Sequence, residues 1–371
     1  MARTVEGGKV RYGVVGLGWI SQAAFMPGVA HTGNSAMTAF VTGDPRKAKS
    51  LGKHYDVTST YHYDAYPKLL ASGEVDAIYL ALPNWQHREF AVPALEAGIH
   101  VLLEKPMATT EEDCRAIEAA AARSGAKLMI AYRLHFEPAT LEAIRLVRAG
   151  TLGDLRVFTS TFAQKIAASN HRAKHGFWAG PVADMGPYPI NAARMMFGAE
   201  PVEVLARGTR RADTPYDFDD TVAVTLRFPG GRLAQFTVAY GLDHADEYTL
   251  VGDKGALTMR PSFGFPGPLA YTLSRDGSEK RHAAPAVDQF GGETQYFSNC
   301  ILKDEHPEPD GEEGRLDVRV IAAVERALAG GHPVQLGPVE RHRRPDPAAQ
   351  RRELPVPRKP SLVHAAEPAE G

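Results

Sequence analysis

The sequence predicts an α/β protein with two different sheets: a doubly wound parallel sheet, then an α+β part with a large, mostly antiparallel open sheet. Short apolar runs alternate with helical patterns up to residue 134, and strand-like runs then follow one another with short breaks. The 371 residues also exceed the roughly 250–300 at which a single core stops growing. We therefore expect domains over residues 1–134 and 135–337, and a tail over 338–371.

The N-terminal apolar runs are typical of strands in a parallel sheet. Such strands are apolar on both faces, and helices connect them. The predicted strands are Val10–Val15, Met37–Thr42, Val75–Leu82, His100–Leu103 and Lys127–Ala131. The predicted helices are Ile20–His31, Pro45–His54, Asp64–Ala71, His87–Ala97 and Thr110–Ser124.

Consecutive strands characterise the second part, and Phe228-Pro229-Gly230-Gly231-Arg232 predicts a hairpin turn between two of them. The predicted strands are Leu155–Ala163, Val202–Ala206, Thr221–Phe228, Leu233–Ala239, Tyr248–Val251 and Ala256–Met259, and helices are expected over Met185–Phe197, Gln289–Leu302 and Arg315–Ala329. The tail contains seven prolines, seven Arg or Lys and five acidic residues. Because it cannot form a core of its own, we expect it to be disordered or to be an extended arm packed on a partner subunit.

The overall composition excludes several classes of protein. The formal net charge of −2 gives no reason to expect nucleic acid as a partner. The two cysteines, Cys114 and Cys300, are far apart, which indicates neither a disulfide framework nor a Cys-based metal site. No run of about 18 apolar residues could span a membrane, and the N-terminus has no apolar signal region, so we expect a cytoplasmic protein.

A glycine-rich turn follows the first predicted strand. In the dinucleotide-binding fingerprint, glycines allow a tight turn and let the backbone approach a pyrophosphate at a helix N-terminus. Here the third glycine position holds Ser21, and a purely structural turn is the alternative. The strand–turn–helix context favours a Rossmann nucleotide site. Its expected cofactor contacts are Gly16, Leu17, Gly18, Trp19 and Ile20.

The end of the second strand decides which dinucleotide is expected. A hydroxyl at Thr42 and a bare backbone at Gly43, followed by Arg46 and Lys47, suit a 2′-phosphate, so NADP is predicted over NAD. Two alternatives concern Asp44. It could be the acid that selects NAD if the register shifts by one residue, or it could be a helix cap beside a solvated basic pair.

Polar residues also follow the other parallel strands, at the edge where ligands bind in open α/β sheets. We expect some of these residues to contact a ligand. The alternatives are that Asn84 is a turn former, His87 a surface residue, Tyr132 a core residue and Lys105 a surface lysine. The further expected cofactor contacts are Leu82, Pro83, Asn84, His87, Glu104, Lys105 and Arg133.

The motifs resemble those of the family of glucose–fructose oxidoreductase, inositol dehydrogenase and MocA proteins, and most of all its glucose–fructose oxidoreductase branch. The resemblance covers residues 10–337. It is carried by GLG (16–18), VTGDPRKAK (41–49), PNWQH (83–87), EKPMATT (104–110), YRLHFEP (132–138), DMGPY (184–188), GDKGAL (252–257) and GEEGRLDVR (311–319). It implies a Rossmann domain, a second domain with a large open sheet, and pyridine-nucleotide chemistry on sugars.

The resemblance also implies a catalytic set of Lys105, Asp184 and Tyr188. Asp184 and Tyr188 are four residues apart at the start of a helical pattern, so one helix face is expected to carry both. A neighbouring ammonium stabilises a phenolate, which would make Tyr188 a usable base. The alternatives are a core position for Tyr188 and a helix cap for Asp184. The expected substrate contacts are Lys105, Tyr132, Arg172, Asp184 and Tyr188, and no metal site is expected.

The function expected from this resemblance is NADP-dependent oxidation of an aldose at C1 to the lactone. A second sugar could reoxidise a retained cofactor, or the cofactor could exchange at each turnover. The alternatives are a reductase or dehydrogenase acting at another carbon of a sugar or sugar nucleotide, and a non-catalytic NADP-binding sensor or scaffold. A homodimer or tetramer formed through the second sheet is expected. WAGPVAD (178–184) and His171-Arg172 depart from the family pattern on the sugar side, which leaves the sugar open.

Overall fold

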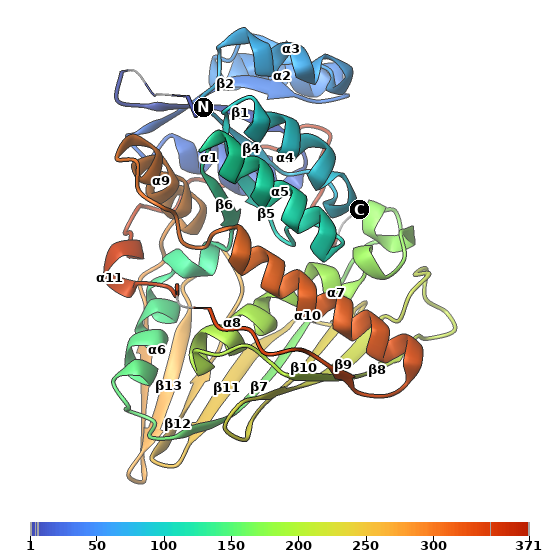
Figure 1. Cartoon of the computed structure of the whole chain (residues 1–371), viewed down its shortest axis with the longest axis vertical. Helices are drawn as coiled ribbons and strands as arrows, with labels where there is room; N and C mark the ends of the chain where they lie inside the picture. Colours follow the sequence, from blue (N-terminus) through green and yellow to red (C-terminus); the bar gives the residue numbers. More distant parts are fainter. Residues whose placement is uncertain (1, 4, 6, 342, 370–371) are drawn as a thin grey trace. The chain divides into compact units, whose positions relative to one another are not determined.

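The computed structural model describes residues 2–3, 5, 7–341 and 343–369, and they form two compact units (Figure 1). The first unit comprises residues 1–133, 288–316 and 352–366, and the second comprises 134–287, 317–351 and 367–371. Both units are discontinuous in sequence, whereas the sequence suggested three consecutive segments. Helix α9 (Gln289–Leu302) belongs to the first unit because it packs there: the hydroxyl of Ser298 is 2.8 Å from those of Tyr12 and Ser35.

The first unit contains the predicted doubly wound parallel sheet. Among the described residues its strand order is β3-β2-β1-β4-β5-β6, the order of a dinucleotide-binding sheet, and each neighbouring pair is parallel. The strands are β1 (Val10–Val15), β2 (Ser35–Val41), β3 (Ser59–Tyr61), β4 (Ala77–Leu80), β5 (His100–Glu104) and β6 (Leu128–Ala131). Strand β3 was not predicted, because three partly exposed residues carry no readable periodicity.

Helices connect these strands as predicted, with one difference at the first connection. There a π-helix, η1 (Ser21–Phe25), precedes the short α1 (Met26–Val29), where a regular helix was expected. The other connections are α2 (Pro45–Tyr55), α3 (Tyr66–Ser72), α4 (His87–Glu96) and α5 (Glu111–Ser124). Helix α5 begins where its cap predicts, because the Thr110 hydroxyl accepts a hydrogen bond from the Asp113 amide.

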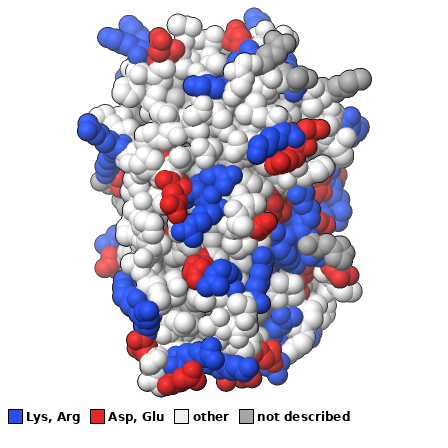
Figure 2. Space-filling model, turned by 90° about the vertical axis from the view of Figure 1, so that its left-hand side faces the viewer, with Lys and Arg blue, Asp and Glu red and all other residues white. Residues whose placement is uncertain are grey.

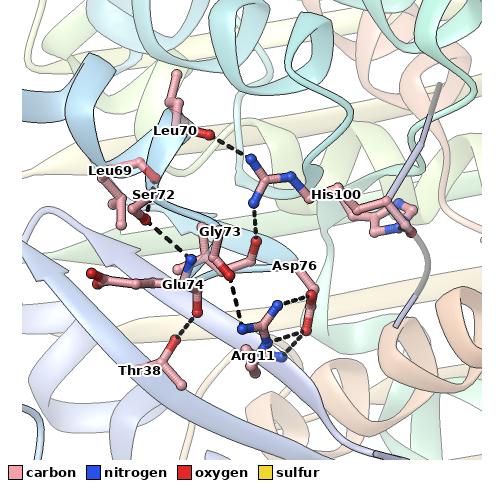
Figure 3. Close-up of polar contacts among 11 residues, drawn as sticks. Arg11, Thr38, Leu69, Leu70, Ser72, Gly73, Glu74, Asp76 and His100 are labelled. Atoms are coloured by element: carbon pink, nitrogen blue, oxygen red, sulfur yellow. Dashed lines mark hydrogen bonds and ion pairs between the residues drawn. The ribbon is translucent and has the colours of Figure 1, made fainter. Parts of the chain in front are cut away.

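The amino-terminal edge of this sheet is joined by side chains (Figure 3). Asp76 is 1% exposed and accepts from Arg11 through both oxygens, at 2.7 Å from Nη2 and 3.0 Å from Nε. The Arg11 guanidinium also donates to the Gly73 carbonyl, and Thr38 donates to the Glu74 carbonyl. His100 Nδ1 accepts from the Lys127 amide at 2.8 Å. The bonds to Gly73, Glu74 and Asp76 fix the loop that leads into β4.

The second unit contains a mixed sheet of order β14-β13-β12-β11-β7-β10-β9-β8-β15 in the described residues (Figure 1). The neighbours are antiparallel except β7 and β10, and the hairpin predicted at Gly230 and Gly231 is confirmed. Strands β13 to β15 were not predicted. The strands are β7 (Leu155–Gln164), β8 (Glu203–Thr209), β9 (Thr221–Phe228), β10 (Arg232–Tyr240), β11 (Ala245–Gly252), β12 (Gly255–Met259), β13 (Ala270–Arg275), β14 (Ser278–Ala283) and β15 (Val334–Gln335).

The helices of the second unit include one that the sequence did not predict, α6 (Pro138–Arg148). The helix expected over 185–197 is present as α8 (Pro187–Phe197), and a separate short helix that was not predicted, α7 (Pro181–Asp184), precedes it. The chain turns at Gly186, where a Cβ atom would lie 2.2 Å from the Val182 carbonyl oxygen, so only glycine fits. The predicted C-terminal helix is present as α10 (Gly311–Gly330).

In its described residues, 338–341 and 343–369, the proline-rich tail is extended apart from one helical turn, α11 (Pro347–Gln350), although its composition favoured disorder. Its polar groups bind to residues far away in the sequence. Composition alone does not reveal such contacts. The Leu354 carbonyl accepts from the Asp288 amide, and the Arg352 guanidinium lies 5.6 Å from the centre of the Tyr296 ring. On the face drawn in Figure 2, Lys and Arg side chains are interspersed with Asp and Glu, as in a surface with mixed ion pairs.

Candidate functional site

The turn after β1 has the geometry of a phosphate-binding loop. Gly16 adopts φ +92°, and a Cβ atom there would lie 2.5 Å from the Ala81 carbonyl oxygen, so the two strand ends can approach only because it is glycine. At Gly18 a Cβ atom would meet no described atom within 4 Å. Ser21 donates to the Gly16 carbonyl at 2.6 Å, so the serine at the third fingerprint position closes the turn. The open backbone at Gly18 fits a dinucleotide phosphate.

The end of β2 shows which role Asp44 has within the chain. Its Oδ1 accepts from the amides of Arg46 (2.8 Å) and Lys47 (3.3 Å), which makes it the N-cap of α2, the second alternative. Its Oδ2 is 2.9 Å from Nδ1 of His364. The His364 imidazole and the capping amides lower the pKa of Asp44 to about 2, so this carboxylate is ionised at neutral pH. The Thr42 hydroxyl accepts from the Asp44 amide.

His87 lies between two strand ends and is 1% exposed, so its surface alternative is wrong. One ring nitrogen is 2.8 Å from the Leu82 carbonyl oxygen, and the other is 3.1 Å from that of Pro106. Burial lowers the pKa of His87, which favours the neutral ring. It positions the segment after Lys105 relative to the end of β4. Asn84 begins the single turn Asn84–Gln86, in keeping with its turn-forming alternative.

Lys105 follows the last residue of β5, at the carboxyl edge of the sheet, and is partly buried. Its amide donates to Glu104 Oε2 at 3.3 Å, and Glu104 Oε1 accepts from the Tyr79 hydroxyl at 2.6 Å. Burial raises the pKa of Glu104. The strand end that carries Lys105 is therefore held by a buried carboxyl group and by His87.

Arg133 and Tyr132 follow β6 and are both buried, at 5% and 6% exposure. Arg133 donates to Gln289 of α9, and its guanidinium lies 5.9 Å from the centre of the Phe290 ring. Glu293, also on α9, is fully buried, and neither of its oxygens has a hydrogen-bond partner among the described residues. Burial raises the pKa of Glu293 well above its usual value, which favours its protonated form. No sequence signal distinguished Glu293 from an ordinary surface glutamate.

In the second unit, Asp184 is the last residue of α7 and lies close to two partners. Its Oδ2 accepts from the Tyr240 hydroxyl at 2.8 Å, and its Oδ1 is 3.6 Å from Nε of Arg172. The structure thus brings together two predicted substrate residues, Asp184 and Arg172. Tyr240 was missed. The inward-facing alternation of β10 could have found it, because a buried tyrosine needs a partner for its hydroxyl.

Tyr188 lies in the first turn of α8, so it and Asp184 do not share one continuous helix. Its ring packs against Phe162 (5.5 Å between ring centres) and Phe263 (5.7 Å). Asp246 fixes the Phe263 loop, because its carboxylate accepts from the amides of Phe263 and Gly264 and from the Ser262 hydroxyl. The phenol is therefore oriented by two rings.

In the part of the chain that the structure describes, no three or more His, Cys, Asp or Glu side chains are grouped so that they could bind a metal ion. No described helix combines the length and hydropathy needed to cross a membrane. Cys114 and Cys300 are buried free thiols.

Comparison with known proteins decides the family. Residues 10–132 match the model of an oxidoreductase family with an NAD-binding Rossmann fold, and residues 140–258 match the GFO/IDH/MocA C-terminal domain. A D-xylose 1-dehydrogenase [NADP(+)] of Haloarcula marismortui is 30% identical over 338 residues, which cover 88% of this chain and 92% of that protein. The chain belongs to the GFO/IDH/MocA oxidoreductase family. The resemblance seen in the motifs is confirmed.

Solved structures of similar proteins show the same fold. An aldose-aldose oxidoreductase from Caulobacter crescentus, complexed with glycerol, is 35% identical, with a TM-score of 0.83, and the match covers 88% of this chain and 100% of that one. A 3-ketoreductase from Actinomadura kijaniata, in complex with NADP and TDP-benzene, is 26% identical with a TM-score of 0.79, over 86% of this chain and 98% of that one. Family members with these names thus differ in the reaction they perform.

Proposed function

We propose that this protein is an NADP-dependent sugar oxidoreductase that oxidises an aldose at C1 to the lactone. The observation that carries the proposal is the near full-length similarity to an aldose-aldose oxidoreductase, together with a lysine at the carboxyl end of β5. Similarity to an NADP-dependent D-xylose 1-dehydrogenase supports the same chemistry. As in an aldose-aldose or glucose–fructose oxidoreductase, a second sugar reoxidises a cofactor that stays bound.

The cofactor proposed is NADP, and the residues at the carboxyl edge of the first sheet fit it. The backbone at Gly18 is open for the pyrophosphate, and the exposed Arg46 and the partly buried Lys47 follow the end of β2. When bound, the nicotinamide supplies the hydride acceptor. The proposed contacts are Gly16, Leu17, Gly18, Trp19, Ile20, Thr42, Gly43, Arg46, Lys47, Leu82, Pro83, Asn84, His87, Glu104, Lys105 and Arg133.

The catalytic residues proposed are Lys105, Asp184 and Tyr188. Tyr188 removes the proton of the C1 hydroxyl as the hydride leaves C1, and its oriented phenol is suited to that role. The Lys105 ammonium stabilises the charge that develops on the sugar oxygen. Asp184, held by Tyr240 and Arg172, orients a sugar hydroxyl. Tyr132 and Arg172 are the further proposed substrate contacts.

Two other functions compete with this one. Reduction at another carbon of a sugar nucleotide is favoured by a specific observation, the similarity to the 3-ketoreductase. A non-catalytic NADP-binding scaffold would not need the Lys105 ammonium or the Tyr188 hydroxyl, and both residues are present.

We further propose that the protein forms a dimer or tetramer through the second sheet. On its outer side, Leu233 and Val251 are 42% and 40% exposed, and both pair with Val157 of the central strand β7. Leu233, Val251 and Val157 are thus three neighbouring apolar side chains on an open sheet face. Such a patch favours a surface that a second subunit covers. Sedimentation of the wild type and of a Leu233→Lys variant tests this, because a charge at the interface would shift the larger species to the monomer.

The function is tested with purified protein and no added nucleotide. Aldoses such as glucose and xylose are added, and the near-ultraviolet absorbance of reduced nicotinamide is recorded. A band that appears at once and disappears on addition of fructose or a second aldose is the expected result. If the band appears only after NADP is added, the protein still oxidises aldoses, but the proposal that the cofactor stays bound is refuted.

Two outcomes would contradict the proposal. Turnover of a 3-keto sugar nucleotide, with no reaction of any aldose, would establish the competing reductase. Failure with every sugar and with both NADP and NAD would favour the scaffold.

A further inference from the structure

The C-terminal segment 352–366 belongs to the first unit, and Gln22 holds it next to the glycine-rich turn that follows β1. The Gln22 side chain donates to the Val363 carbonyl at 3.0 Å and accepts from the Val363 amide at 2.7 Å. The same Nε2 donates to the Leu17 carbonyl at 2.9 Å. Because Gln22 is only 1% exposed, the segment is fixed to the turn by a buried side chain.

The next residue, His364, reaches the end of β2. Its backbone adopts φ +46°, a left-handed conformation that histidine accepts more readily than most residues, and its ring lies 2.9 Å from Asp44 Oδ2. The other Asp44 oxygen accepts from the two capping amides of α2. Both oxygens of Asp44 are therefore occupied by groups of this chain.

This occupation bears on the choice between the two dinucleotides. In Rossmann domains, an acid at the end of the second strand holds the ribose 2′-hydroxyl of NAD, whereas a 2′-phosphate needs positive charge there. Asp44 lies three residues beyond the end of β2, and an exposed carboxylate at that place would repel a phosphate. His364 places a basic group on the oxygen that the helix cap does not use.

We propose that His364 is a specificity-determining residue for the cofactor. By binding Asp44 Oδ2, it keeps this carboxylate from acting on the ribose 2′ position and thereby favours a dinucleotide that carries a 2′-phosphate. This inference rests on the proposed use of NADP. It assigns to the C-terminal tail a role in ligand selection. The role of this contact in stability is minor, because a polar contact between two partly exposed side chains contributes little to folding.

The test compares two ligands that differ only in the 2′-phosphate, 2′,5′-ADP and 5′-AMP, by calorimetric titration of the full-length protein. The wild type is expected to prefer 2′,5′-ADP, and His364→Ala is expected to reduce that preference about tenfold, the order of one like-charge contact that is screened by water. His332→Ala, at an exposed histidine of the second unit, is the matched control and is expected to keep the wild-type ratio.

Two further variants separate the mechanism from its alternatives. Asp44→Asn keeps the helix cap but removes the charge, so adding His364→Ala to it is expected to change the ratio less than about twofold. Val363→Pro removes the amide that donates to Gln22 and is expected to act in the same direction as His364→Ala.

An unchanged ratio in His364→Ala would overturn the inference. An equal loss in the Asp44→Asn background would also overturn it, because the histidine would then act on the phosphate itself. A wild type that binds both nucleotides equally would refute the proposed cofactor, and this inference with it.

Discussion

The two edges of the first sheet use their polar residues differently. At the amino-terminal edge, Asp76 and Arg11 bind each other, and the loop into β4 is held by side chains of its neighbours (Figure 3). At the carboxyl edge, the backbone at Gly18 is open and Lys105 follows a strand end. The first edge stabilises the fold, and the second is the edge at which we propose that the ligand binds.

The comparison teaches that the loss of a charged side chain is expected to affect stability at one edge and ligand chemistry at the other. An Asp–Arg pair in which one partner is buried cannot lose a member without leaving a charge unpaired. We expect that Lys105, at the opposite edge, can be removed with little loss of stability, because the role proposed for it concerns a ligand. Five variants test this division, in order of decreasing effect.

Lys105→Met should have the largest effect, and on activity alone. We expect kcat to fall at least about 1000-fold because the ammonium no longer stabilises the sugar oxyanion. The dissociation constant for NADP should change less than about threefold, since the phosphate-binding turn is intact. Stopped-flow kinetics and calorimetry measure both. Lys68→Met, at an exposed position of α3, is the control. Activity within about tenfold of wild type would refute the role of Lys105.

Gly16→Ala and Gly18→Ala should separate folding from binding within one turn. A methyl group at Gly16 meets the Ala81 carbonyl at a positive φ, so we expect a loss of about 2–4 kcal/mol in the free energy of unfolding. At Gly18 it meets no described atom, so stability should change by less than about 1 kcal/mol while NADP affinity falls at least tenfold. Urea unfolding and calorimetry measure the two effects. Equal destabilisation by both variants would contradict the open backbone at Gly18.

Asp76→Ala should destabilise the protein and leave catalysis unchanged. Removal of this buried acid takes away the acceptor of the Arg11 amide, Nε and Nη2, at a cost of about 2–4 kcal/mol. Asp64→Ala is the matched control, because its side chain is 94% exposed and its pairing with His62 contributes little. Urea unfolding distinguishes the two, and a shared small effect would show that the amino-terminal edge is not held by Asp76.

His100 should make this edge sensitive to acid. Burial lowers the pKa of His100 to about 4, below the usual value near 6.5 of the unfolded chain. As the pH falls between these values, the unfolded chain binds a proton that the folded protein does not, so stability present above pH 6.5 is lost progressively. By pH 4.5 the wild type should lose about 2–3 kcal/mol more than His100→Gln. Urea unfolding at several pH values measures this, and parallel curves would show that His100 does not titrate on unfolding.

Much of the fold could be predicted from the sequence because its strong signals are local. Strands β1 and β9 have the predicted bounds, and the hairpin at Gly230 is where its glycines indicate. The break at Gly186 could not be predicted, because it depends on a close contact with Val182, and the short β3 and β15 have too few residues for a pattern.

The candidate site was predictable where a motif marks it. Asp184 and Arg172 were expected near a substrate, and they lie close together. Tyr240 and His364 were missed because each acts through a partner distant in sequence, and Glu293 was missed because its burial depends on the packing of α9. Asp44 shows the same limit: its cap was visible in Asp44-Pro45, but its second partner is 320 residues further along the chain.

The discontinuity of the first unit affects how the protein is made. Synthesis runs from the N-terminus, and domains generally fold as units when their residues are available. Residues 134–287 of the second unit leave the ribosome before α9 exists, and the first unit is complete only after residue 366 has been added. A chain that terminates early, even after all six strands of the first sheet have been made, therefore lacks both a packing helix and the segment that reaches Asp44.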